Sequence, residues 1–310
     1  MLDERLAAAH SCLATVHSGT GHYEEAIEEF QRALDIEPTN DDFTRELARA
    51  EEKLGKIEDA ERTLRQAITL RPHYWANYNL LGRFYFNRGQ YAKAADMFSE
   101  VTKLAPDSLY GYSNLGGAQI RLGLYSDAIP NFERSTAIRP TGLAYSNLAT
   151  AYFNKRRFLD AATAFEKATK LDEKNYAIWG NLGDAYYWAP GMRSQAPDAY
   201  RKAIALGEEA AKVNPRDAIL LSRIAGYYAM IDEKQPALAY LKRALDILPD
   251  EPSVRFKAAL IHNHFKEVDQ TLDWLEKATK AGYSLTTIRD LPDFDHLWGY
   301  RRFQDLLRSN

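Results

Sequence analysis

The chain has 310 residues, a formal net charge of -3 and a pI of about 6.2, so it lacks the basic surface expected of a nucleic-acid-binding protein. Its single cysteine, Cys12, excludes an internal disulfide and is typical of a reducing compartment, so we expect a cytoplasmic protein. No apolar run is long enough to span a bilayer, and the acidic start MLDERLAAAH is unlike a signal peptide, so we expect no membrane partner.

Regularly spaced prolines divide the chain. Pro38, Pro72, Pro106 and Pro140 are each 34 residues apart, and Pro215 and Pro249 have the same spacing. Between them the same residue types recur in register. Residues 75–108 give the fullest copy, with Tyr78, Leu81, Gly82, Tyr85, Ala94, Phe98, Val101 and Pro106.

This order of aromatic, Leu, Gly or Ala, Tyr, Ala, Phe and Pro resembles the tetratricopeptide repeat (TPR) family, whose repeat has about 34 residues. The resemblance implies an all-α solenoid of antiparallel helix pairs, wound as a right-handed superhelix with the first helices lining a concave groove. We expect one TPR array over residues 1–285 and a capping segment over 286–310. The eight expected repeats are 7–40, 41–74, 75–108, 109–141, 142–175, 176–217, 218–251 and a degenerate 252–285.

Small residues have two expected roles in these repeats. The Gly or Ala after the core leucine lets the two helices of a pair approach closely, as at Gly82, Gly116, Ala149 and Gly183. A second set follows the first helix and suits the left-handed residue that ends a helix, namely Gly21, Gly55, Gly89 and Gly123.

The sixth repeat is longer than the others and reads YWAPGMRSQAPDAYRKA between Tyr186 and Ala203. Pro190, Gly191 and Pro197 predict a loop, followed by an extended second helix to about Val213. We favour a longer pair that packs like the rest. The alternative is a loop at the groove edge, with Tyr187 and Trp188 as an aromatic surface for a partner.

The tail after Leu285 predicts a loop with Leu291, Pro292 and Phe294, and then a short amphipathic helix with Phe303, Leu306 and Leu307. We favour a cap on the apolar end of the array, and docking to another domain is the alternative. The sixth repeat and the tail resemble the TPR regions of bacterial multidomain kinases, cyclases and winged-helix regulators.

Three asparagines precede a core leucine at the same register position, in YSNL at Asn114 and Asn147 and in WGNL at Asn181. One residue turns about 100° around a helix, so these amides are expected on the concave surface, as a ladder that Asn79 extends. An amide both donates and accepts, and so pairs with the backbone of an extended peptide. This is similar to the asparagine ladders of O-GlcNAc transferases and peroxisomal targeting-signal receptors. The alternative is that the amides only solvate the groove.

Other groove positions supply aromatic and charged side chains for a peptide site. They are Arg83, Phe86, Arg121, Phe153, Asn154, Asp184, Tyr187 and Trp188, and Arg45 and Arg49 fall on the same face of the second repeat. The Lys/Asn/Arg set with which some TPR proteins clamp chaperone tails is missing, which disfavours a chaperone-tail receptor.

Enzyme signatures are missing, with no phosphate loop, H-E-x-x-H or G-x-S-x-G motif. His10 and His17 read as packed histidines, so we expect no metal and no cofactor. The sequence predicts a non-enzymatic scaffold that binds an extended peptide of a protein partner in its groove. Two alternatives stay open: a regulatory or sensory arm of a larger bacterial kinase, cyclase or transcription regulator, and a self-association module.

Overall fold

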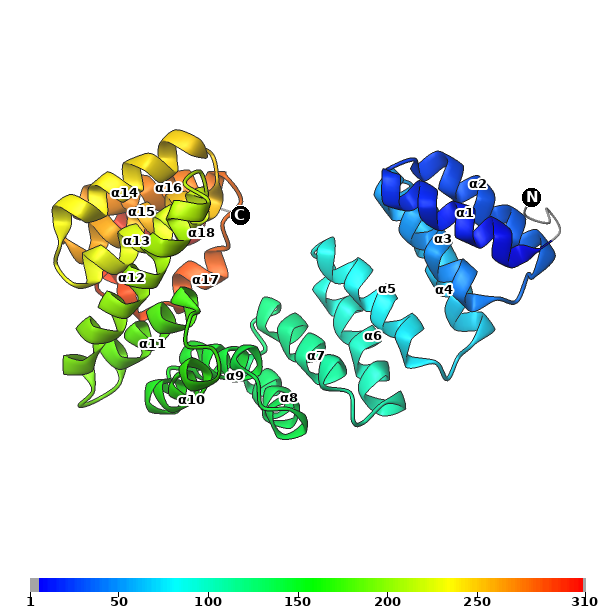
Figure 1. Cartoon of the computed structure of the whole chain (residues 1–310). Coiled ribbons are helices and arrows are strands. Elements are labelled where there is room, and N and C mark those ends of the chain that lie inside the picture. The colour runs from blue at the N-terminus through cyan, green and yellow to red at the C-terminus, as the bar shows by residue number, and fades with distance from the viewer. Residues whose placement is uncertain (1–5, 309–310) are drawn as a thin grey trace. The chain divides into compact units, whose positions relative to one another are not determined.

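The structure is a computed structural model that describes residues 6–308, and within that range all regular elements are helices (Figure 1). Close contacts divide the chain into two units, the first ending at Ile138 and the second beginning at Arg139. Each unit is a series of helix pairs in which every helix packs on the next one along the chain.

Unit 1 holds four pairs of nearly equal length. Their helices are α1 (Ala7–Thr20), α2 (Tyr23–Ile36), α3 (Asp41–Leu54), α4 (Ile57–Leu70), α5 (Trp75–Asn87), α6 (Tyr91–Leu104), α7 (Leu109–Arg121) and α8 (Tyr125–Ile138). Each second helix ends two residues before the proline of its repeat, because proline has no N–H to continue the helix.

Unit 2 holds four more pairs and the tail. Its helices are α9 (Gly142–Asn154), α10 (Phe158–Leu171), α11 (Tyr176–Trp188), η1 (Arg193–Gln195), α12 (Ala196–Val213), α13 (Ala218–Met230), α14 (Lys234–Ile247), α15 (Pro252–His264), α16 (Val268–Lys280), α17 (Leu285–Asp290), η2 (Pro292–Gly299) and α18 (Arg301–Arg308). The extended helix of the sixth repeat is α12, which ends at Val213 as predicted. Pro197 lies in its first turn rather than in the loop, at a position where a missing N–H costs no helical bond.

Glycines allow the close approach inside the pairs, as predicted. A Cβ atom on Gly82 would lie 2.6 Å from the ring of Phe98, and one on Gly116 would lie 2.8 Å from the ring of Phe132. Both rings are fully buried, so they have no space into which to move.

Two neighbouring glycines of α7 give a matched test of this packing. We expect Gly116→Ala to lower the free energy of unfolding by about 1–3 kcal/mol, because the added methyl group overlaps Phe132. Gly117→Ala is expected to raise it by about 0.5–1 kcal/mol, because a Cβ there meets nothing within 4 Å and alanine favours the helix. Urea unfolding followed by circular dichroism measures both, and equal effects of the two changes would contradict this packing.

The turn after the first helix has a left-handed residue in both units. Gly21, Gly55, Gly89 and Gly123 have φ values of 83°, 86°, 72° and 75°, as predicted. In unit 2 the corresponding turns carry the non-glycine residues Arg156, Asp232 and Lys266, with φ of 56°, 64° and 60°. A left-handed conformation costs residues other than glycine roughly 1–2 kcal/mol. These three residues therefore adopt it against their own backbone preference.

The tail packs on the last helix pair of unit 2. Buried side chains of α17, η2 and α18 meet those of α15 and α16 in one apolar cluster, which includes Phe256, Leu272, Leu275, Ile288, Phe294, Leu297 and Phe303. We propose that the tail is the cap of the array. Its expected loop is partly helical, because η2 begins at Pro292.

Candidate functional site

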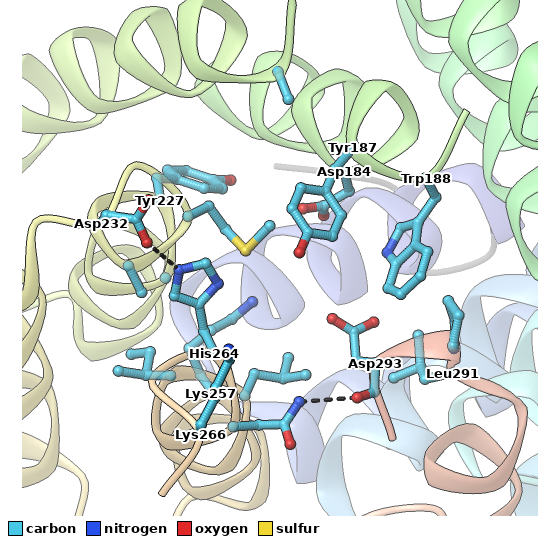
Figure 2. Close-up of a pocket in the computed structure, with 18 of the residues that line it drawn as sticks. Asp184, Tyr187, Trp188, Tyr227, Asp232, Lys257, His264, Lys266, Leu291 and Asp293 are labelled. Atoms are coloured by element: carbon cyan, nitrogen blue, oxygen red, sulfur yellow. Dashed lines mark hydrogen bonds and ion pairs between the residues drawn. The ribbon is translucent and has the colours of Figure 1, made fainter. Parts of the chain in front are cut away.

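A cavity of about 890 Å³ lies in unit 2 (Figure 2). Its walls come from the first helices of four successive pairs, α9, α11, α13 and α15, together with the tail. Residues three or four apart lie on the same face of a helix, so one face of each helix lines the cavity. On α15 this face includes Lys257, Leu260, Ile261 and His264. The lining also includes Phe153, Asp184, Tyr187, Trp188, Arg193, Tyr227, Asp232, Lys266, Leu291, Asp293, Asp295 and His296.

Aromatic rings form one wall of the cavity. The ring of Trp188 stacks on that of Phe158 at 6.0 Å between centroids, and Tyr187 meets Trp188 edge-on at 5.3 Å. The long loop of the sixth repeat orients Tyr187, because Arg193 donates from Nη2 to its hydroxyl oxygen at 2.6 Å and covers its ring. Both Tyr187 and Trp188 therefore line the cavity from positions fixed by their neighbours.

Three charged groups lie deep in the same cavity. The hydroxyl of Tyr200 donates to Oδ1 of Asp184 at 2.7 Å. Burial raises the pKa of Asp184, and it raises the pKa of Asp293 to about 6 with help from the nearby charge of Asp184. Burial also lowers the pKa of Lys257. Among the described residues, no ion pair joins Lys257 to either carboxylate. All three residues are half-buried.

Five of residues 291–296 line the cavity from the tail, and we call this segment the strap. Nδ2 of Asn263 donates to the backbone oxygen of Asp293 at 2.9 Å. Arg156 donates to both carboxylate oxygens of Asp295, at 2.6 and 2.8 Å. The strap therefore connects the eighth repeat to the turn of the fifth repeat, inside unit 2.

Four of the side chains predicted for the site line this cavity: Phe153, Asp184, Tyr187 and Trp188. The lining does not include Asn147, Asn154 or Asn181, which are half-buried. In the part of the chain that the structure describes, the side chains of Asn147 and Asn181 form no hydrogen bond within the fold.

The remaining predicted residues belong to unit 1. Nδ2 of Asn114 donates to Oδ1 of Asn79 at 2.9 Å, which occupies one hydrogen-bonding group of each amide. Phe86 and Arg121 both contact Tyr91. The hydroxyl of Tyr91 accepts from Nη2 of Arg121 at 2.7 Å, and Phe86 packs edge-on against the ring of Tyr91. Arg83 is exposed.

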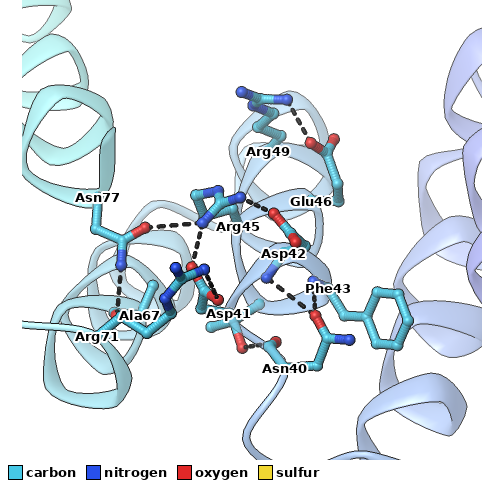
Figure 3. A network of polar contacts seen from close by, with 11 residues as sticks. Asn40, Asp41, Asp42, Phe43, Arg45, Glu46, Arg49, Ala67, Arg71 and Asn77 are labelled. Atoms are coloured by element: carbon cyan, nitrogen blue, oxygen red, sulfur yellow. Dashed lines mark hydrogen bonds and ion pairs between the residues drawn. The ribbon is translucent and has the colours of Figure 1, made fainter. Parts of the chain in front are cut away.

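Arg45 is a correction, because it does not present its charge to a groove (Figure 3). It is buried, donates to Asp41 and Asp42, and reaches Oδ1 of Asn77 at 3.1 Å. Asn77 is fully buried and donates to the backbone oxygen of Ala67 at 2.7 Å. Arg45 thus joins α3 to α5 in a structural network.

Sequence reasoning missed several lining residues. It gave Lys257, His264 and Asp293 no role in the site. The available signal was the helical spacing from Lys257 to His264, which places both on one face of α15.

A search of residues 6–308 finds no group of three or more His, Cys, Asp or Glu that could hold a metal ion. The same residues include no helix both long and apolar enough to cross a membrane. The absence of a cofactor and of enzyme activity stays a prediction.

Two family models described as "Tetratricopeptide repeat" match the chain, one at residues 19–69 and the other at 45–108, 79–142 and 146–207. The chain belongs to the tetratricopeptide repeat family. Solved TPR structures support the same fold. The structure titled MamA 41-end from Desulfovibrio magneticus RS-1 has a TM-score of 0.51 and 22% identity over 55% of this chain and 96% of its own. The Cut9–Hcn1 hetero-tetramer of APC/C has a TM-score of 0.56 and 15% identity over 92% of this chain and 52% of its own. The predicted all-α TPR solenoid is therefore confirmed.

Among curated proteins, the Hsp70-Hsp90 organizing protein of Triticum aestivum is 32% identical over 124 residues, which are 40% of this TPR chain and 21% of the relative. The chain thus spans about a fifth of the length of that relative. The likeness covers repeats only, and the resemblance to bacterial signalling proteins stays a prediction.

Proposed function

We propose that this TPR chain is a protein-interaction module that binds an extended segment of a partner protein, with one anchor side chain in the cavity of unit 2. The observation that carries the proposal is the convergence of aromatic and charged side chains from four helix pairs on one cavity of about 890 Å³. That size suits a few side chains, and anchors of interfaces are commonly aromatic or charged pockets. The relative from Triticum aestivum is named as an organizing protein for Hsp70 and Hsp90, and this supports a role in joining proteins.

The strap supports the proposal because it shows, within the chain, a side-chain amide of a first helix holding a backbone group of another segment. Its backbone is extended at Leu291, with φ of -76° and ψ of 129°. The Asn263 amide holds the backbone oxygen two residues later, at 2.9 Å. An amide on the first helix of the eighth repeat thus binds a backbone group of the 3-10 helix η2 without contacting the side chain of that residue.

The asparagines of the ladder are proposed to add backbone contacts to the same guest. Asn147 and Asn181 lie near the middle of α9 and α11 of unit 2, six residues before Phe153 and seven residues before Trp188. Each new hydrogen bond would contribute about 0.5–1.5 kcal/mol, so these amides alone give weak binding. The anchor in the cavity must supply the larger share.

Replacing Trp188 tests the proposal. Peptides are selected from a random library on the full chain, and their affinities are measured by calorimetry. We expect Trp188→Ala to weaken binding about 10- to 100-fold, because a buried aromatic wall is lost. Trp298→Ala is the control, since Trp298 is 44% exposed and lies outside the lining, and it should change affinity by less than about twofold.

Asn147→Ala combined with Asn181→Ala should weaken the same peptides about three- to tenfold, in line with one or two lost hydrogen bonds. Circular dichroism checks that the variants stay folded. Selected peptides that bind Trp188→Ala and the wild-type chain equally would contradict binding in the cavity.

A further inference from the structure

We propose that the cavity of unit 2 is a receptor for a basic side chain, lysine or arginine, and that this side chain is the anchor of the bound segment. The inference rests on the proposed function and adds the chemical class of the guest. It follows from the balance of charges in the cavity once the groups that already have partners are set aside.

Most charged groups of the lining are already paired. Asp295 is held by Arg156, and Asp232 accepts from Nε2 of His264 at 2.8 Å. Arg193 keeps its positive charge, and its guanidinium lies over the ring of Tyr187, 4.1 Å from the ring centroid. Lys266 and His296 are exposed at the rim. The deep part of the cavity is left with two carboxylates, Asp184 and Asp293, and one ammonium group, Lys257.

Asp293 has the least compensated charge. Figure 2 shows its carboxylate pointing into the cavity on the side of Tyr187 and Trp188. Within residues 6–308, no other residue donates a hydrogen bond to that carboxylate or forms an ion pair with it. A largely desolvated carboxylate is unfavourable when the only compensating cation, Lys257, forms no ion pair with it. Burial, together with the charge of Asp184, raises the pKa of Asp293.

Asp184 adds a second negative charge on the opposite wall. One oxygen accepts from Tyr200, and its nearby cations are Lys257 and, outside the lining, Arg223. The negative charge of Asp184 raises the pKa of Asp293. A cation between the two walls would relieve both.

Lys257 lies near enough for its charge to lower the pKa of both carboxylates, but among the described residues it forms an ion pair with neither of them. Its side chain packs along Gly226, where a Cβ atom would lie 2.8 Å from Cδ of Lys257. The amine is therefore held at the α13 side of the cavity and reaches neither carboxylate as an ion pair. Trp188 offers the opposite side an aromatic ring, and an aromatic ring beside a carboxylate is favourable for a lysine or arginine head group.

The test uses the full chain and four pentapeptides, acetyl-Gly-Gly-X-Gly-Gly-amide, with Lys, Arg, Leu or Glu at X. Binding is followed by NMR at the indole N–H of Trp188. We expect the Lys and Arg peptides to bind at least about tenfold more tightly than the Leu peptide, and the Glu peptide not to bind. Because these peptides are short, the titrations extend into the millimolar range.

Two variants are expected to have opposite effects. Asp293→Asn should weaken the Lys and Arg peptides about tenfold, and it leaves the backbone oxygen that Asn263 holds. Lys257→Met should strengthen them about three- to tenfold, because a competing cation is removed.

Asp269→Asn is the control, since Asp269 is an exposed aspartate of α16 and should have no effect. Asp184→Asn repeats the loss if Asp293→Asn disturbs the strap.

Different failures have different meanings. If the Glu peptide binds best and Lys257→Met abolishes its binding, the cavity is an anion receptor and the inference is wrong. If the Leu and Lys peptides bind equally and Asp293→Asn has no effect, the inference fails while peptide binding in the cavity stands. If no pentapeptide binds and the library peptides ignore Trp188→Ala, both the inference and the proposed function fail.

Discussion

Replacing Phe294 with alanine is expected to lower the free energy of unfolding at the C-terminal end of unit 2 by about 3–5 kcal/mol, the usual cost of removing a buried phenylalanine. Phe294 is 1% exposed, and its ring lies 6.0 Å from that of Phe256 and 6.3 Å from that of Phe303. It joins η2 to the last helix pair, so its loss weakens the apolar attachment of the tail, to which Ile288, Leu297 and Phe303 also contribute. The remaining ties of the strap are polar and partly exposed, and the Arg156–Asp295 pair contributes only about 0–1 kcal/mol at its degree of exposure.

Hydrogen exchange with mass spectrometry measures this effect. We expect faster exchange in residues 285–308 of Phe294→Ala, together with a lower urea midpoint. Tyr300→Ala is the control from the same tail, because Tyr300 is 45% exposed and packs little. If the two variants unfold alike, the tail is not attached through the Phe294 cluster.

The second large effect is expected in unit 1, at Arg45. Arg45→Ala should cost about 3–5 kcal/mol, because it leaves a buried carboxylate and a buried amide with fewer partners (Figure 3). Asp41 would keep Arg71, which donates to it at 3.0 Å, so the lower part of that range is expected. Oδ1 of Asn77 would lose its donor inside the protein.

Arg49 gives the matched control one helical turn later on α3. It is exposed and pairs only with the exposed Glu46, so Arg49→Ala should change the free energy of unfolding by less than about 0.5 kcal/mol. Hydrogen exchange in residues 41–54 of the full chain separates the two variants. Equal protection in Arg45→Ala and Arg49→Ala would show that Arg45 is not a structural residue.

The helix pairs were predictable because their signals are local and repeated. Proline follows the second helix for the same reason in six of the eight copies, at Pro38, Pro72, Pro106, Pro140, Pro215 and Pro249. Gly82, Gly116 and Gly183 are small because a ring of the partner helix fills the space. The sixth repeat was also readable, since Pro190 and Gly191 interrupt the helix and the apolar pattern resumes until Val213.

The site was predictable only in part. Phe153, Asp184, Tyr187 and Trp188 follow from their positions on first helices, but the sequence does not indicate which polar groups they meet. Arg45 shows the same limit, because its register favours the groove while buried Asp41 and Asn77 hold it inside.

By itself, the sequence determined the period, the helix pairs and the face of each helix, because these depend on backbone sterics and on spacing within one repeat. Only the tertiary structure decided that the strap lines the cavity and is tied to the fifth repeat through Arg156 and Asp295, which are 139 residues apart. Only it brings Lys257 beside two carboxylates without pairing to either. Charges interact through space and not along the chain, so their balance is set by the packing that brings distant repeats together.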